Sequence, residues 1–452
     1  MKTFSVAAAL AAATTVFALP SPTEDLVARA SSASLPAITV KGNAFFNGDS
    51  RFYMRGVDYQ PGGSSDLVDP IADSTTCKRD IVQFQKLGIN TIRIYTVDNT
   101  ANHDDCMAQL AAAGIYLVLD VNTPLYSLNR ADPHPSYNSV YLQNIFATID
   151  AFANYTNTLA FFSGNEVIND DLTTPAAPYV KAVTRDMRQY IRSRGYRSIP
   201  VGYSAADVNS NRKEMAEYMN CGTDDERSDF FAFNDYSWCD PSSFTTSGWD
   251  QKVKNFTGYG LPIFLSEYGC NTNTRKWEEV KSLYSTDMTS VYSGGLVYEY
   301  SQEESKYGLV TLSGSTVTPL ADFTALQTAF KATANPSGDG GYNSTGGASG
   351  CPAKSANWNV DSDALPAIPS AAAAMMKTGA GKGAGLEGKG SQNAGGTSTG
   401  TATQGSGTAT QTGKTGATSS GAANAVRAPF DAQPLFVSAV ALGFTFLGAV
   451  LL

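Results

Sequence analysis

Short apolar runs that alternate with amphipathic stretches are the feature of this chain that most constrains its fold. Eight such runs occur, at residues 52–59, 90–97, 115–121, 159–162, 199–203, 230–233, 262–265 and 295–300. Helical patterns lie between them, among others at 77–87, 105–113, 140–155, 177–194 and 274–292, and three of these are followed at once by Gly88, Gly114 or Gly195. Strands that alternate with helices in this way predict an α/β fold, a (β/α)8 TIM barrel, with a doubly wound open sheet as the alternative.

Polar residues gather at the ends of these runs, which is where a (β/α)8 barrel places its chemistry. They include Asp58, Arg93, Asp120, Asn165, Glu166, Asp207, Asn234, Glu267 and Glu299. Two runs share one design, because 159–167 reads LAFFSGNEV and 262–269 reads PIFLSEYG. A lone Asn-Glu pair is as compatible with a solvated loop as with a functional site. The second run, which also ends in serine and glutamate, favours the functional interpretation.

Two glutamates at the ends of the fourth and seventh strands would face each other across the barrel mouth. Such a pair suits glycoside chemistry, in which one carboxyl protonates the leaving oxygen and the other attacks or activates water. We therefore predict Glu166 and Glu267 as the catalytic residues. Asn165 is expected to donate a hydrogen bond to a sugar hydroxyl, and Tyr236 or Tyr298 to orient the nucleophile. The sequence does not fix the distance between the carboxylates, which separates retaining from inverting enzymes.

Other chemistries find little support in the sequence. Only two histidines occur, His103 and His134, in polar loop-like contexts, and no phosphate-binding glycine loop or dinucleotide motif is present in the folded region. We predict no cofactor and no metal. The net charge of −9 disfavours nucleic acid and anionic lipid surfaces as partners, whereas it is compatible with a neutral polymer.

The two ends of the chain carry targeting patterns. Residues 1–18 predict a secretory signal peptide, with an apolar, alanine-rich run after Lys2. Residues 425–452 combine a polar spacer with an apolar tail, and they predict a signal for a GPI lipid anchor attached at Gly421 or Asn424. A single membrane-spanning tail anchor is the alternative. We expect the protein on the extracellular face of the plasma membrane and in the cell wall, as a monomer.

Composition divides the mature chain into two parts. Residues 31–350 are expected to form the barrel domain, and residues 351–424, rich in glycine, serine and threonine, a flexible stalk. Six cysteines in a secreted chain suggest three disulfides, with the pairing left open by the sequence. The predicted N-glycosylation acceptors are Asn154, Asn255 and Asn343.

Five motifs in order resemble the fungal cell-wall β-1,3-glucanosyltransferases, the Gas/Gel/Phr group of glycoside hydrolase family 72. They are GVDYQPGG (56–63), LVLDVNTP (117–124), FFSGNEV (161–167), FNDYSWC (233–239) and FLSEYGC (264–270), and the resemblance covers about residues 36–355. It implies Glu166 as acid/base and Glu267 as nucleophile. The glucan-binding positions that it implies are Tyr95, the 122–130 loop with Asn122 and Arg130, Asn165, Asp207, Arg212, Tyr236 and Tyr298. It also implies the disulfides Cys77–Cys106, Cys221–Cys351 and Cys239–Cys270.

The resemblance implies a retaining β-1,3-glucan transglycosidase. Such an enzyme cleaves an internal β-1,3 bond and transfers the new reducing end to the non-reducing end of another glucan chain. Two alternatives remain open in the sequence. The same two glutamates would serve an endo-β-1,3-glucanase, and a non-catalytic glucan-binding wall protein could share the layout.

Overall fold

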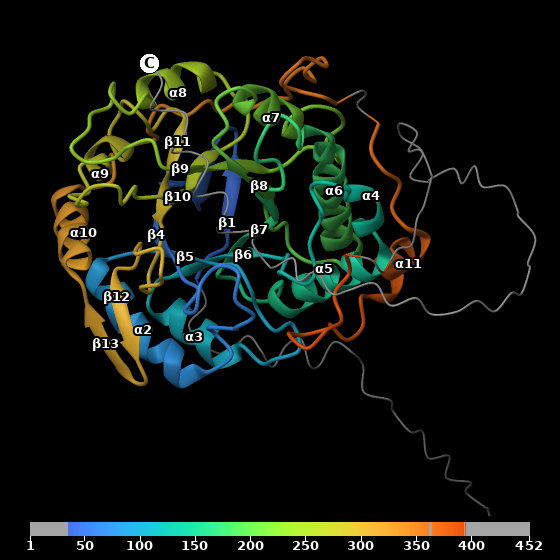
Figure 1. The fold of residues 1–452 in the computed structure, drawn as a ribbon, viewed down its shortest axis with the longest axis horizontal. Helices are drawn as coiled ribbons and strands as arrows, with labels where there is room; N and C mark the ends of the chain where they lie inside the picture. Colours follow the sequence, from blue (N-terminus) through green and yellow to red (C-terminus); the bar gives the residue numbers. More distant parts are fainter. Residues whose placement is uncertain (1–34, 361–363, 393, 395–452) are drawn as a thin grey trace, which may run out of the picture.

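Eight parallel strands close into a barrel at the centre of the molecule (Figure 1). The computed structural model describes residues 35–360, 364–392 and 394. The strands pair in chain order from β4 to β11, and β11 closes the barrel against β4. They are β4 (Met54–Asp58), β5 (Thr91–Ile94), β6 (Tyr116–Asp120), β7 (Thr158–Asn165), β8 (Val201–Ala206), β9 (Phe230–Asp235), β10 (Ile263–Tyr268) and β11 (Tyr292–Val297). The predicted (β/α)8 barrel is confirmed, and the open sheet is excluded.

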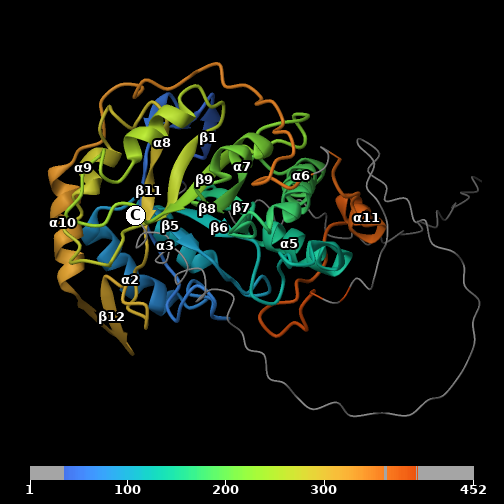
Figure 2. The same cartoon turned by 45° about the horizontal axis from the view of Figure 1, so that its top comes forward.

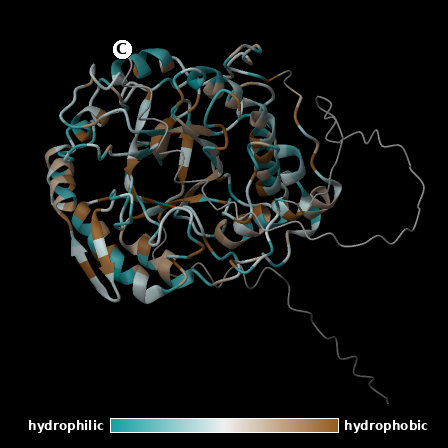
Figure 3. Cartoon of the chain, in the orientation of Figure 1, coloured by the Kyte–Doolittle hydropathy of each residue, from teal (hydrophilic) through white to brown (hydrophobic). Residues whose placement is uncertain are grey.

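Phenylalanine rings fill the interior of the barrel. Phe162, Phe230 and Phe264 are fully buried, and their ring centroids lie 5.4 to 5.9 Å apart. Figure 3 shows the hydrophobic colouring of the central strands, in contrast to hydrophilic outer helices such as α8. An antiparallel sheet of β1 (Ile38–Lys41), β2 (Ala44–Asn47) and β3 (Ser50–Phe52) precedes the barrel. Its Phe45 packs on Phe230 and Phe264 and so closes the N-terminal end of the barrel.

Helices surround the barrel (Figures 1 and 2). They are α2 (Ser74–Leu87), α3 (Asp104–Ala112), α4 (Pro133–Ser136), α5 (Ser139–Phe152), a 3-10 turn (Thr174–Ala176), α6 (Ala177–Ser193), α7 (Arg212–Met219), α8 (Trp249–Phe256), α9 (Glu279–Leu283), α10 (Ala321–Ala332) and α11 (Ser370–Thr378). A hairpin of β12 (Val310–Ser313) and β13 (Thr316–Pro319) leads into α10. Loops follow the C-terminal ends of the barrel strands.

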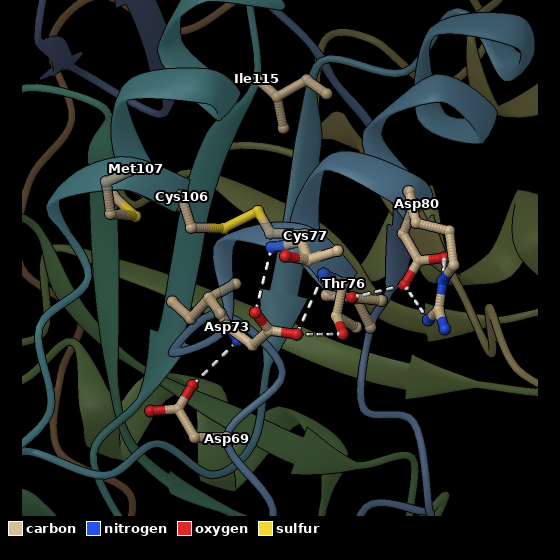
Figure 4. The surroundings of a disulfide bond; sticks show 12 residues. Asp69, Asp73, Thr76, Cys77, Asp80, Cys106, Met107 and Ile115 are labelled. Atoms are coloured by element: carbon tan, nitrogen blue, oxygen red, sulfur yellow. Dashed lines mark hydrogen bonds and ion pairs between the residues drawn. A yellow bond between two sulfur atoms is a disulfide. The ribbon is translucent and has the colours of Figure 1, made fainter. Parts of the chain in front are cut away.

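The first barrel helix shows how the sequence sets its boundaries. The Asp73 carboxylate caps α2 by accepting hydrogen bonds from the backbone of Thr75 and Thr76, and Gly88 ends the helix with a φ of 72°. Figure 4 shows this cap beside the disulfide that joins Cys77 of α2 to Cys106 of α3. The structure forms the same three pairs that the resemblance implies, with Cys221–Cys351 and Cys239–Cys270 as the others.

Two local expectations differ from the structure. The helix expected over 274–292 is confined to α9, and Tyr292 already begins β11. Within β11, Gly294 adopts a φ of 84° with the Met54 carbonyl directly against it, a conformation that favours glycine. Strands β7, β9 and β10 also extend further than the apolar runs, so that Asn165, Asn234 and Glu267 lie within strands rather than after them.

The structure describes part of the region for which we expect a flexible stalk, namely residues 351–360, 364–392 and 394. Trp358 is fully buried and packs on Tyr218, with ring centroids 5.4 Å apart. Helix α11 lies against α5 and α6 (Figures 1 and 2). The few apolar residues of this region, among them Leu365 and Ala372, complete the hydrophobic core of the barrel domain. A segment poor in apolar residues can therefore be ordered because the barrel supplies the rest of the apolar surface.

Several predicted features lie outside the described residues. These are the signal peptide (1–18), the possible attachment residues Gly421 and Asn424, and the apolar tail within 425–452. Among the helices that the structure describes, none is both long and apolar enough to cross a membrane.

Replacing Trp358 by alanine tests whether the folded unit extends beyond Cys351. Removing this fully buried side chain is expected to lower the free energy of unfolding by about 3–5 kcal/mol. Trp358→Phe retains much of the packing against Tyr218 and is expected to lose less. Chemical denaturation of both variants measures the effect, and wild-type stability of Trp358→Ala would contradict the described packing.

Candidate active site

Glu267 lies in β10 and is held by donors on both of its carboxylate oxygens. Its Oε1 accepts hydrogen bonds from the Tyr95 hydroxyl at 2.7 Å and from the Arg93 guanidinium at 3.2 Å. Its Oε2 accepts one from the Tyr236 hydroxyl at 2.7 Å. Donors of this kind favour the charged carboxylate and fix its direction. Of the two tyrosines expected to orient the nucleophile, Tyr236 makes the contact, whereas the Tyr298 hydroxyl lies 3.5 Å from that of Ser64.

Glu166 follows β7 directly, in an unusual backbone conformation. Its φ of 47° is in the left-handed region, which a non-glycine residue adopts only where its surroundings hold it. Its backbone N–H donates to the Ser204 carbonyl of β8 at 2.9 Å, and its Oε1 accepts a hydrogen bond from the Asn234 side-chain amide at 2.8 Å. The turn at Glu166 thus places one carboxyl at the mouth of the barrel, where Asn234 is its one side-chain donor among the described residues.

A polar network under the mouth joins four neighbouring strands. The Ser204 hydroxyl donates to Asn165 Oδ1 at 2.7 Å and lies 2.9 Å from the Ser266 hydroxyl. The Asn234 amide bridges the Asn165 side chain and the Glu166 carboxylate. Ser266 immediately precedes Glu267 in β10. The network therefore fixes Asn165 and both glutamate-bearing strands relative to one another.

Arg93 is the buried cation beside the nucleophile candidate. It donates to both oxygens of Asp120, at 2.8 and 3.2 Å, and to Glu267. Its guanidinium carbon also lies 4.2 Å from the ring centroid of Tyr95 and 4.6 Å from that of Phe162. Burial and the charge of Glu166 raise the pKa of Glu267 to about 7, although Arg93 and the two tyrosine hydroxyls oppose that rise.

Asp58, at the end of β4, adds a third carboxyl to this interior. It is fully buried, and no hydrogen bond from the described residues reaches either of its carboxyl oxygens. Burial, together with the charges of Glu267, Asp120 and Glu299 and against that of Arg93, holds the pKa of Asp58 well above its usual range. The described side-chain hydrogen bonds of Arg93 go to Asp120 and Glu267 rather than to Asp58.

Four tyrosines line one side of the site. Tyr236 meets Tyr298 and Tyr307 edge to face, with centroids 6.4 and 5.6 Å apart, and Tyr95 belongs to the same cluster. Such rings offer faces to sugar C–H groups. Tyr307 was not predicted, because it lies in a loop after β11 and no spacing rule singles it out. Arg275 fixes that loop by donating to the backbone carbonyls of Tyr298 and Tyr307.

The remaining predicted glucan-binding residues follow strands β6 and β8. Asp207 pairs with Arg212 and also accepts a 2.6 Å hydrogen bond from Lys252, which bridges to Asp235. Asn122 donates to the Ser163 carbonyl at 3.0 Å and accepts from the Tyr141 hydroxyl at 2.5 Å. Arg130 is half-buried in the same loop, where its charge acts on Tyr203. Ionic or hydrogen-bond partners within the chain thus hold Asp207, Arg212 and Asn122. The loop after β6 carries Asn122 and Arg130, the loop after β8 carries Asp207, and Arg212 is the first residue of α7.

Comparison with known proteins identifies the family of this barrel. The family model described as glucanosyltransferase, glycoside hydrolase family 72, matches residues 27–334. The chain belongs to this family. It is 72% identical over 390 residues to 1,3-beta-glucanosyltransferase gel1 of Aspergillus fumigatus, with 86% of this chain and 85% of that protein covered. It is 55% identical to 1,3-beta-glucanosyltransferase GAS5 of Saccharomyces cerevisiae, with 78% and 74% covered.

Solved structures of this glucanosyltransferase family share the fold. A variant of Saccharomyces cerevisiae Gas2p, in complex with laminaritetraose and laminaripentaose, aligns with a TM-score of 0.69 at 38% identity. The alignment covers 74% of this chain and 75% of that one. Another structure of the same yeast protein, in complex with a compound, aligns with a TM-score of 0.70 at 39% identity. The predicted resemblance is confirmed at the level of sequence and fold.

The hydroxyl of Tyr236 gives a test of the electrostatics around Glu267. Tyr236→Phe removes a donor that favours the carboxylate, so the pKa of Glu267 should rise above its value of about 7. The acid limb of kcat/KM is expected to move to higher pH, and its plateau to fall at least about tenfold, because a hydrogen bond to a charged group is lost.

Tyr307→Phe is the matched control, since Tyr307 belongs to the same aromatic cluster and donates no described hydrogen bond to Glu267. It should leave the acid limb in place. An acid limb that stays unchanged in Tyr236→Phe, or that moves equally in both variants, would contradict the assignment.

Proposed function

We propose that this chain is a retaining β-1,3-glucan transglycosidase that elongates cell-wall glucan. The observation that carries the proposal is the environment of Glu267, whose two oxygens accept hydrogen bonds from Arg93, Tyr95 and Tyr236. These donors stabilise and aim a carboxylate, as a nucleophile requires. Glu166 has only the Asn234 amide on Oε1 among the contacts that the structure describes, so its carboxyl can exchange a proton with the substrate.

The reaction would proceed by double displacement. Glu267 attacks the anomeric carbon of the donor glucan while Glu166 gives its proton to the leaving oxygen, so that a glycosyl–enzyme bond forms as the glycosidic bond breaks. The shortened reducing-end fragment then leaves. Glu166, now ionised, takes a proton from the 3-hydroxyl of a second glucan chain, and the resulting oxygen displaces Glu267. The acceptor chain gains the donor segment at its non-reducing end, and both carboxyls return to their starting states.

The similarity to named relatives supports glucan as the substrate. The relatives in Aspergillus fumigatus and Saccharomyces cerevisiae are named 1,3-beta-glucanosyltransferases, and a yeast family member was crystallised with laminari-oligosaccharides. The tyrosine cluster beside Glu267 provides a wall of rings against which sugar faces can pack. The acceptor is therefore a second β-1,3-glucan chain in this proposal. With water in its place the same residues would catalyse hydrolysis.

We also propose that the protein acts outside the cell as a monomer on a GPI anchor. The signal peptide and the apolar tail that the sequence predicts support this location. The predicted acceptors Asn154 and Asn255 are exposed, and Asn343 is half-buried. Three disulfides fit an oxidising compartment. Both glutamates come from one barrel, so that the chemistry needs no second copy.

Product sizing tests transfer directly. The purified protein incubated with a reduced laminari-oligosaccharide should give products longer than the substrate, which chromatography or mass spectrometry resolves. Glu267→Gln should abolish both long and short products, because an amide cannot act as the nucleophile. If the wild type gave only products shorter than the substrate, the protein would be a hydrolase and the proposal of transfer would be wrong. Full activity of Glu267→Gln would overturn the assignment of the nucleophile.

A further inference from the structure

A glycine-rich segment from the far end of the described chain lies against the loop that follows β6. We call residues 379–392 the clasp; they continue from the end of α11. The clasp is first fixed to the outer helices. The Ala380 backbone N–H donates to the Tyr190 hydroxyl at 2.8 Å, and the Gln143 side chain of α5 donates to the carbonyls of Ala380 and Lys382 at 3.0 and 2.7 Å.

The glycines of the clasp allow close contact with the barrel. A Cβ added to Gly383 would lie 2.0 Å from the Asn99 side-chain oxygen, and one added to Gly388 would lie 2.1 Å from the Tyr126 hydroxyl. Tyr126 is itself almost fully buried, so it has little room to move. At these two positions glycine permits a close approach of the backbone. The glycine content of this segment, which predicts flexibility, allows tight packing against the barrel here.

The end of the clasp is hydrogen-bonded to the 122–130 loop. The Ser391 backbone N–H donates to the Leu125 carbonyl at 2.9 Å, and the Gln392 side chain donates to the carbonyl and the hydroxyl of Ser127 at 2.7 and 3.0 Å. The Asn138 side chain donates to the Ser391 carbonyl at 2.7 Å. Ser391 is completely buried by these contacts. The clasp thus covers the outer side of the loop.

The same loop reaches the active site on its other side. Asn122 at its start bonds the carbonyl of Ser163, three residues before Glu166 in the chain. The Tyr141 hydroxyl that holds Asn122 comes from α5, and Asn138, which contacts the clasp, caps this helix at its N-terminus. Arg130 at the end of the loop and Glu166 both act electrostatically on Tyr203. The loop therefore connects the clasp to the surroundings of the acid/base candidate.

We propose that the clasp is a positioning element that holds the 122–130 loop in its glucan-binding conformation. The inference rests on the proposed function, in which this loop contributes to glucan binding. The clasp touches neither glutamate, so its loss should weaken the binding of glucan and leave the chemical step in place. A looser loop also holds the acceptor chain less well against water, so the ratio of transfer to hydrolysis should fall.

The variant Gly388→Val tests the proposal in the otherwise intact protein, because its side chain cannot fit against Tyr126. The KM for a laminari-oligosaccharide should rise at least about fivefold, with kcat for donor cleavage within about twofold of wild type and the transfer ratio reduced. Gln392→Ala removes only the two hydrogen bonds to Ser127. It should raise the KM and reduce the transfer ratio by less than Gly388→Val does. Hydrogen exchange should accelerate in residues 122–130 and stay unchanged in the barrel strands.

Glu387→Ala is the matched control, since Glu387 is exposed and precedes Gly388 directly. It should behave as wild type. Unchanged KM, transfer ratio or loop exchange in Gly388→Val would overturn the proposal, as would a loss confined to kcat. These outcomes are separate from a failure of the proposed function, which would appear in the wild type as an absence of elongated products.

Discussion

The buried guanidinium of Arg93 is the charge on which the active site of this barrel depends. Asp58, Asp120 and Glu267 interact with it and are all largely buried, and Glu166 lies close enough to raise the pKa of Glu267. Carboxyls in such a place can ionise only near a compensating cation. Arg93 pairs with Asp120 through two hydrogen bonds and gives a third to Glu267. Its position between the rings of Tyr95 and Phe162 fixes the direction of that third bond.

The sequence predicts much of the fold and the two glutamates because both depend on local patterns. Each barrel strand appears as a short apolar run, and each glutamate follows a serine near the end of such a run. Helix α2 ends before Gly88 as predicted, but it begins at Ser74 rather than at Cys77, because the Asp73 carboxylate caps it there. The prediction over 274–292 is wrong in extent, since the helix covers only Glu279–Leu283 and β11 already begins at Tyr292.

The partners of the glutamates could not be predicted in the same way. Arg93 and Glu267 are separated by 174 positions in the sequence, and only barrel closure brings them together. The sequence predicts Asn234 as a polar residue at a strand end. Its hydrogen bond to Glu166 depends on the backbone turn at Glu166, where φ is 47°. Tyr307 enters the aromatic cluster through a loop that Arg275 holds by its backbone carbonyls. Contacts of this kind depend on tertiary geometry rather than on spacing.

The central claim is that Glu267 attacks the sugar, and covalent trapping tests it most directly. A 2-deoxy-2-fluoro laminari-oligosaccharide with a good leaving group slows the second displacement, so that the glycosyl–enzyme intermediate accumulates. Peptide mass spectrometry of the trapped protein should find the sugar on Glu267. A label on Glu166 or on any other residue, or products with inverted anomeric configuration, would contradict the account.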